Sequence, residues 1–156
     1  MTLTDTTEAA ERMALALAQG GLQKATARVM AAFLFADADS VTAPELAGQL
    51  AISSGSVSGA IKMLSTVGLI ERVPVPGSRR EHYRLREGAW ATLMSTQNGL
   101  VQTMFEAADQ GIQAAGADSP AARRLAEMRD FYGFMFRELP ALVDRWRAER
   151  AGGRPV

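Results

Sequence analysis

The sequence predicts a mainly α-helical fold with one small β-hairpin, and three observations support this prediction. Apolar residues recur at intervals of three and four along most of the chain, which is the period of a helix with one buried face. Two short alternating segments flank a turn signal, Pro76-Gly77-Ser78, as the strands of a hairpin would. At 156 residues, with 47% hydrophobic and 22% charged, the chain is long enough for one globular domain with a helical extension.

The composition excludes several classes of function. The absence of cysteine rules out disulfides and thiolate metal sites, and a single histidine, His82, argues against metal sites and serine triads built on histidine. No set of acid, base and nucleophile can be assembled, so we expect no enzyme activity and no cofactor. No apolar run approaches the ~20 residues that cross a bilayer, and residues 1–12 lack the features of a signal peptide. We therefore expect a cytoplasmic protein without a membrane partner.

Positive charge gathers in one part of a chain whose net charge is zero. Residues 51–90 contain three acidic residues against six basic ones, which are Lys62, Arg72, Arg79, Arg80, Arg84 and Arg86. A local basic patch suits a polyanionic partner better than the charge of the whole chain indicates. Arg84 and Arg86 are expected on a solvated strand face.

Three helices are predicted in the first fifty residues. The first runs to about Gln19, with its N-cap among Asp5 to Thr7, and ends at two glycines. The second covers about residues 22–36, and a polar break follows it. Thr42 then caps a short helix over 43–50, whose first turn tolerates Pro44 and favours Glu45.

A fourth helix follows a tight connection and is capped by Ser53 or Ser54. One of its faces is apolar and anchors it, while the remaining positions are small and polar. The segments 69–75 and 81–86 form the hairpin, and Pro74 is tolerated only on an edge strand. A short helix, a turn, a second helix and an arginine-tipped hairpin together predict a winged helix-turn-helix.

The small polar face of the fourth helix predicts a DNA contact. The second helix of such a unit enters the major groove, where serine hydroxyls reach bases or phosphates and a lysine reaches a phosphate. Gly59 lowers helix stability by ~1 kcal/mol relative to Ala, and close approach of a partner is one reason to keep it. The structural alternative is that serines at a helix N-terminus serve as caps. The candidate DNA-binding residues are Ser53, Ser54, Ser56, Ser58, Gly59, Lys62, Arg79 and Arg80.

One stretch of the chain resembles a known family. The segment SSGSVSGAIKMLSTVGLIERV followed by PGSRREHYRL is similar to the recognition helix and wing of MarR-type winged helix-turn-helix transcriptional regulators. The neighbouring GLQKATARVMAAFLFAD and TAPELAGQLAIS look closest to the GbsR-like branch, so the resemblance covers about residues 20–87. Many MarR wings carry Asp before the paired arginines, whereas this chain has Ser78.

The resemblance implies a homodimer in which terminal helices of both chains form the interface and two winged units bind a pseudo-palindromic operator. Many relatives are repressors that a small ligand releases. By this likeness Ser54, Ser56, Ser58 and Lys62 lie on the recognition helix, and Arg79 and Arg80 on the wing.

The C-terminal half is predicted to form long helices for association. Apolar residues keep helical spacing from Trp90 to Ile112 and from Leu125 to Trp146, and Pro140 is expected to kink or restart the second helix. Pairing with a second copy would cover the apolar face, and the alternative is a monomer in which these helices fold back on the winged unit. Late aromatic residues suit an apolar or cationic ligand, but a stripe of Met and aromatic residues at helical spacing is more often core or dimer interface, so no ligand residue is assigned.

These observations divide the chain into an N-terminal helix over 1–20 that joins the dimerisation region, a DNA-binding unit over 21–88 and a helical dimerisation region over 89–156. The predicted function is a bacterial transcriptional regulator that binds double-stranded DNA as a homodimer. It is expected to be a repressor with a small-molecule effector. The alternative is a winged-helix module that binds proteins and does not read DNA sequence.

Overall fold

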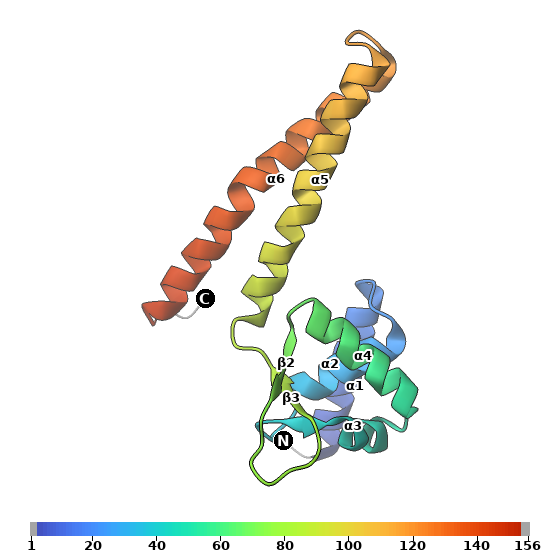
Figure 1. The fold of residues 1–156 in the computed structure, drawn as a ribbon, viewed down its shortest axis with the longest axis vertical. Coiled ribbons are helices and arrows are strands. Elements are labelled where there is room, and N and C mark those ends of the chain that lie inside the picture. The colour runs from blue at the N-terminus through green and yellow to red at the C-terminus, as the bar shows by residue number, and fades with distance from the viewer. Residues whose placement is uncertain (1–2, 154–156) are drawn as a thin grey trace. The chain divides into compact units, whose positions relative to one another are not determined.

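The computed structural model describes residues 3–153, and these residues form helices α1 to α6 and three short strands (Figure 1). The chain divides into two compact units, Met1–Ala89 and Trp90–Val156. No helix in the described range is long and apolar enough to cross a membrane.

Four helices build the first unit: α1 (Leu3–Gln19), α2 (Lys24–Leu34), α3 (Ala43–Leu50) and α4 (Ser54–Thr66). Helix α2 is the centre of this unit, because both α1 and α4 pack on it and its Val29 and Met30 are fully buried. Arg28 ties three helices together by donating to the Glu11 carboxylate on α1 and to the Leu50 carbonyl at the end of α3.

The predicted start of the first helix was wrong. Helix α1 already begins at Leu3, so Asp5 to Thr7 lie inside it and do not cap it. Thr and Asp reduce helix stability by at most about 0.7 kcal/mol each relative to Ala, so a polar stretch alone need not end a helix.

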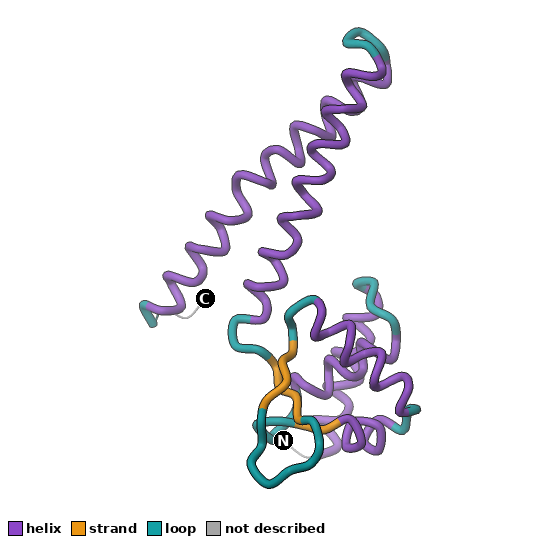
Figure 2. Tube along the Cα trace, viewed as in Figure 1, coloured by secondary structure: helices purple, strands orange, loops and turns teal. Residues whose placement is uncertain are grey.

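A three-stranded antiparallel sheet completes the first unit, with strands β1 (Val41–Thr42), β2 (Ile70–Val73) and β3 (His82–Leu85) in the order β1-β3-β2 (Figure 2). Strand β3 is central: His82 pairs with Val73 on one side and Thr42 on the other. Pro74 follows the edge strand β2, as its missing N–H requires. The sequence did not predict β1, because two residues are too few to show an alternating pattern.

The turn between α3 and α4 sets the helix-turn-helix. Ala51 ends α3 in the left-handed conformation, with φ of 51°, and the Ile52 N–H donates to the Ala47 carbonyl at 3.3 Å. Left-handed backbone costs a residue with a side chain about 1–2 kcal/mol, so the packing of the two helices must hold this turn.

The second unit contains α5 (Ala89–Ala115) and α6 (Pro120–Ala151), which returns beside α5 (Figure 1). The two helices meet where Arg129 pairs with Asp109 at 3.2 Å and where Gly133 faces the ring of Phe105. Ser119 caps α6 by accepting from the Ala122 N–H. Helix α6 runs through Pro140 without a break, so of the predicted kink or restart the structure excludes the restart.

Candidate nucleic-acid interface

Helix α4 has one buried face and one exposed face, as its sequence predicts. Its Val57, Ala60, Ile61 and Leu64 are buried against the first unit. The exposed positions include every predicted contact on the helix and its cap, which are Ser53, Ser54, Ser56, Ser58, Gly59 and Lys62. The face turned away from the core therefore consists mostly of small side chains, with one cation, Lys62, and one large apolar side chain, Met63.

The serines at the start of α4 have different hydrogen bonds. Ser53 is the N-cap: its Oγ accepts from the Ser56 N–H at 3.1 Å, and its hydroxyl is 2.9 Å from Ser56 Oγ. Within the described residues, the hydroxyls of Ser54 and Ser58 have no hydrogen-bond partner. Ser53 thus fits the structural alternative, whereas Ser54, Ser56 and Ser58 keep hydroxyl groups that can serve a ligand.

Packing within the described residues does not explain the glycine at position 59. A Cβ built at Gly59 meets no atom within 4 Å. An alanine would therefore fit at this position and strengthen the helix.

The wing loop, residues 74–81, carries Arg79 and Arg80 between β2 and β3, and both side chains are exposed. Gly77, with φ of 82°, allows the turn, in which the Ser78 N–H donates to the Val75 carbonyl at 3.1 Å. The arginines of the strands are paired: Arg72 with Glu81 at 2.8 Å, and Arg84 with Glu71 at 2.9 Å.

The ion pairs decide which positive charges remain available. Arg86 also lies 3.8 Å from the Glu71 carboxylate. Among residues 51–90, all of which the structure describes, Lys62, Arg79 and Arg80 have no carboxylate partner, and we call them the three unpaired cations. These are the three cations that the sequence assigned to DNA.

The carboxylate of Glu81, which follows the paired arginines, is bound by residues of the hairpin strands. Glu81 pairs with Arg72 and accepts from the Tyr83 hydroxyl at 2.7 Å. This hydrogen bond, together with burial, raises the pKa of Tyr83. The negative charge nearest to Arg80 in sequence is thus already engaged by its own hairpin.

Ser78 joins the wing loop to the sheet. Its Oγ accepts from the Arg80 N–H at 3.2 Å and lies 2.9 Å from Nε2 of His82. The other ring nitrogen of His82 lies 3.1 Å from the Ser40 hydroxyl, beside β1. No pattern in the sequence indicates this chain of hydrogen bonds, because Ser40 and His82 are 42 residues apart.

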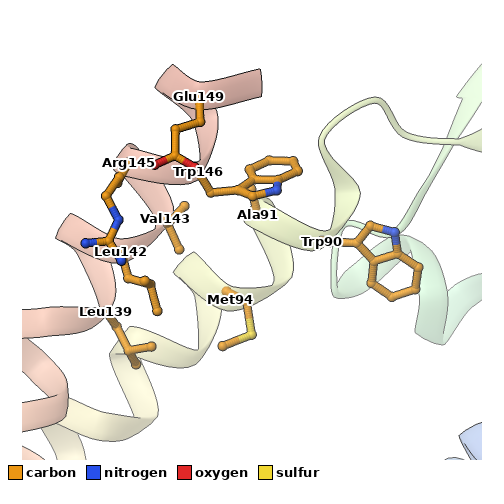
Figure 3. Close-up of a pocket in the computed structure, with 9 residues that line it drawn as sticks. All are labelled: Trp90, Ala91, Met94, Leu139, Leu142, Val143, Arg145, Trp146 and Glu149. Carbon is orange, nitrogen blue, oxygen red and sulfur yellow. The ribbon is translucent and has the colours of Figure 1, made fainter. Parts of the chain in front are cut away.

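The second unit contains an apolar pocket of about 360 Å³ between the start of α5 and the end of α6. Figure 3 shows Met94 of α5 and Leu139 and Val143 of α6 gathered in it, with Trp90 standing to one side. Arg145 and Glu149 are the charged residues of its lining.

Three comparisons with known proteins agree with this architecture. Residues 88–149 match the family model of MmpR5-like MarR family transcriptional regulators. The chain is 33% identical over 149 residues to the HTH-type transcriptional regulator MmpR5 of Mycobacterium tuberculosis (strain ATCC 25618 / H37Rv), covering 95% of this chain and 90% of that protein. A crystal structure of a transcriptional regulator superposes with a TM-score of 0.80 at 32% identity, covering 92% of this chain and 99% of the other.

The fold and the exposed face of α4, which we call the recognition helix because it is the second helix of the helix-turn-helix, define a winged helix-turn-helix DNA-binding protein. Because it is 33% identical to the MmpR5 regulator over 95% of its length and matches the MmpR5-like family model over residues 88–149, the chain belongs to the MarR family of transcriptional regulators. The predicted fold class, the family and the absence of enzyme activity are confirmed, since this is a family of regulators and not of enzymes. The individual contact residues stay predictions.

Proposed function

We propose that this protein is a homodimeric repressor that binds a pseudo-palindromic operator through α4 and the wing loop. The observation that carries the proposal is the small exposed face of α4 together with the three unpaired cations, of which Lys62 lies on α4 and Arg79 and Arg80 lie on the wing loop. The cations supply most of the affinity by neutralising phosphates, and Ser54, Ser56 and Ser58 supply specificity. The repressor role follows the resemblance to MarR-type regulators.

The proposed spacing of the two α4 helices on DNA requires a dimer of this chain. Helices α5 and α6 leave large apolar side chains in water, and Phe131, Phe134 and Leu142 are each more than half exposed. A second chain related by a two-fold axis is the simplest cover for such a surface. The two α4 helices would then enter successive major grooves about 34 Å apart.

The wing is tested by replacing Arg79 and Arg80 together with Ala. Binding to a labelled operator duplex, measured by fluorescence anisotropy across a salt series, should weaken, and the salt slope should fall by about 0.9 for each phosphate that is no longer neutralised. The matched control is Arg123→Ala with Arg124→Ala, which removes the same charge from exposed positions on α6. Unchanged operator affinity in the Arg79→Ala, Arg80→Ala variant would show that these arginines do not contact DNA.

The recognition helix is tested in the same assay. Ser56→Ala or Ser58→Ala should change the preference at particular base pairs, by about 1–3 kcal/mol per strong contact, and leave the salt slope as it is. A protein without salt-sensitive duplex binding would instead support the protein-binding module. That alternative rests on the single cation of the recognition helix.

The apolar pocket supports release by a small ligand. Its lining is largely apolar, with Arg145 and Glu149 as its charged residues, so it suits an apolar molecule with a small polar group. The ligand would act by preferring a dimer whose recognition helices are wrongly spaced. Repeating the operator titration with ligand present tests this step, and a ligand that binds without changing DNA affinity contradicts it.

Two finer assignments belong to the proposal. A regulator that binds the chromosome of a bacterium works in the cytoplasm, and we place the protein there. The likeness of residues 20–87 to the GbsR-like branch stays a proposal, since the matching family model covers residues 88–149.

A further inference from the structure

The position before the paired arginines keeps a hydrogen-bond acceptor although it lacks an acid. Ser78 Oγ accepts from the backbone N–H of Arg80, two residues further on, which closes a small turn at the tip of the wing loop. Besides this bond, the turn at Gly77 and the contacts of Glu81 with Arg72 and Tyr83 hold the exposed loop.

The same oxygen is anchored to the centre of the sheet. His82 lies on the central strand β3, and its ring spans the Ser78 hydroxyl at 2.9 Å and the Ser40 hydroxyl at 3.1 Å. A neutral imidazole has one donor and one acceptor nitrogen, whereas each serine hydroxyl can donate or accept. Both bonds therefore form in either tautomer, and Ser78 Oγ keeps a lone pair for the Arg80 N–H.

We propose that Ser78 and His82 are positioning residues for DNA binding, which hold the wing loop so that Arg79 and Arg80 face the duplex. The inference rests on the proposed contact of these arginines with DNA. Its basis is the connected path from Ser40 through His82 and Ser78 to the Arg80 backbone, ending at two arginines that form no ion pair with the described residues. Holding the loop in place lowers the ordering entropy that would otherwise oppose binding.

Ser78→Ala is the first test. It should weaken operator binding about two- to tenfold, the range expected from one net hydrogen bond. Ser78→Thr, which keeps the hydroxyl, should restore wild-type affinity. Ser95→Ala is the matched control, because it removes a serine hydroxyl that bonds only within α5.

A double-mutant cycle separates positioning from general loosening of the fold. In the Arg79→Ala, Arg80→Ala background, Ser78→Ala should have no further effect on affinity, because the groups through which it acts are gone. A purely structural role would give the same loss in both backgrounds. Ser40→Ala, at the other end of the path, should give a smaller loss of operator affinity, and this loss should also disappear in the Arg79→Ala, Arg80→Ala background. This variant replaces Ser78→Ala in the cycle if Ser78→Ala does not fold.

The outcomes distinguish this inference from the proposed function. If the arginine double variant weakens binding and Ser78→Ala does not, the positioning role is overturned and the DNA contact stands. If the arginine double variant binds as tightly as the wild type, the wing contact itself is overturned. Additive losses in the cycle overturn the positioning role alone.

Discussion

Gly59 is a residue whose presence the protein's own packing does not explain. It lies on the exposed face of α4, and its missing Cβ leaves open space. A side chain there would stand between the helix backbone and whatever approaches it. If α4 enters the major groove, as proposed, the base edges on the floor of the groove approach the helix backbone at Gly59.

Gly59→Ala should therefore move two measured quantities in opposite directions. The free energy of unfolding should rise by up to about 1 kcal/mol, because Ala is the better helix former, while operator affinity falls. Urea unfolding and anisotropy titration measure the two effects. Gly99→Ala, at another open helical position, is the control and should change stability alone. A Gly59→Ala variant that binds as well as the wild type would show that the backbone does not approach DNA closely.

At the scale of single elements, α3 shows how a local motif fixes the start of a helix. The Thr42 N–H donates to the Glu45 carboxylate at 2.7 Å, and the Thr42 hydroxyl exchanges bonds with Glu45 in a capping box. These two hydrogen bonds to the carboxylate hold the pKa of Glu45 below its ordinary value of 4.5, and the positive charge of Arg80 acts in the same direction.

The pH dependence of this cap follows from the lowered pKa. A carboxyl whose pKa is lower in the folded state stabilises the protein above its unfolded pKa, and this contribution is lost as the pH falls through the folded value. Glu45→Gln should therefore be less stable than the wild type at neutral pH, and the gap should narrow below pH 4.5. Urea unfolding across pH measures the gap. Glu87→Gln is the control at another exposed carboxylate, and a gap for Glu45→Gln that does not change with pH would contradict the assignment.

The elements that the sequence predicted are those with a repeating pattern or a cap. The helical spacing of apolar residues indicated α2 to α6. Two helix starts were also predicted from capping residues: Thr42 caps α3, and of the two candidates for α4, Ser53 and Ser54, the structure shows Ser53 as the cap. Strand β1 was missed, since its two residues form a strand only because β3 lies beside them. The path from Ser40 to Ser78 was missed for the same reason: tertiary folding alone brings it together. The exposure of the predicted contact residues on α4 could be predicted, because the apolar residues of this helix lie on its opposite face and are buried.

At the scale of the whole molecule, the exposed aromatic residues of α6 carry the prediction of a dimer. Phe131→Glu with Phe134→Glu should give a monomer in sedimentation experiments, because charges would be buried in an apolar interface. Operator affinity should fall by a factor of about 100 or more, since linked binding of two sites is lost. Gln110→Glu adds charge at an exposed polar position of α5 and is the control. A variant pair that remains dimeric would place the interface elsewhere.

If the three unpaired cations make the phosphate contacts, as proposed, the pairing of the strand arginines with Glu71 and Glu81 limits how tightly the protein holds DNA of arbitrary sequence. A protomer that brings three cations to the backbone displaces few counterions, so the millions of competing sites in a genome retain it weakly. Only a small fraction of the protein is then bound to chromosomal sites other than the operator. A small number of copies should suffice to keep the operator occupied, and the protein should redistribute quickly once the operator is lost.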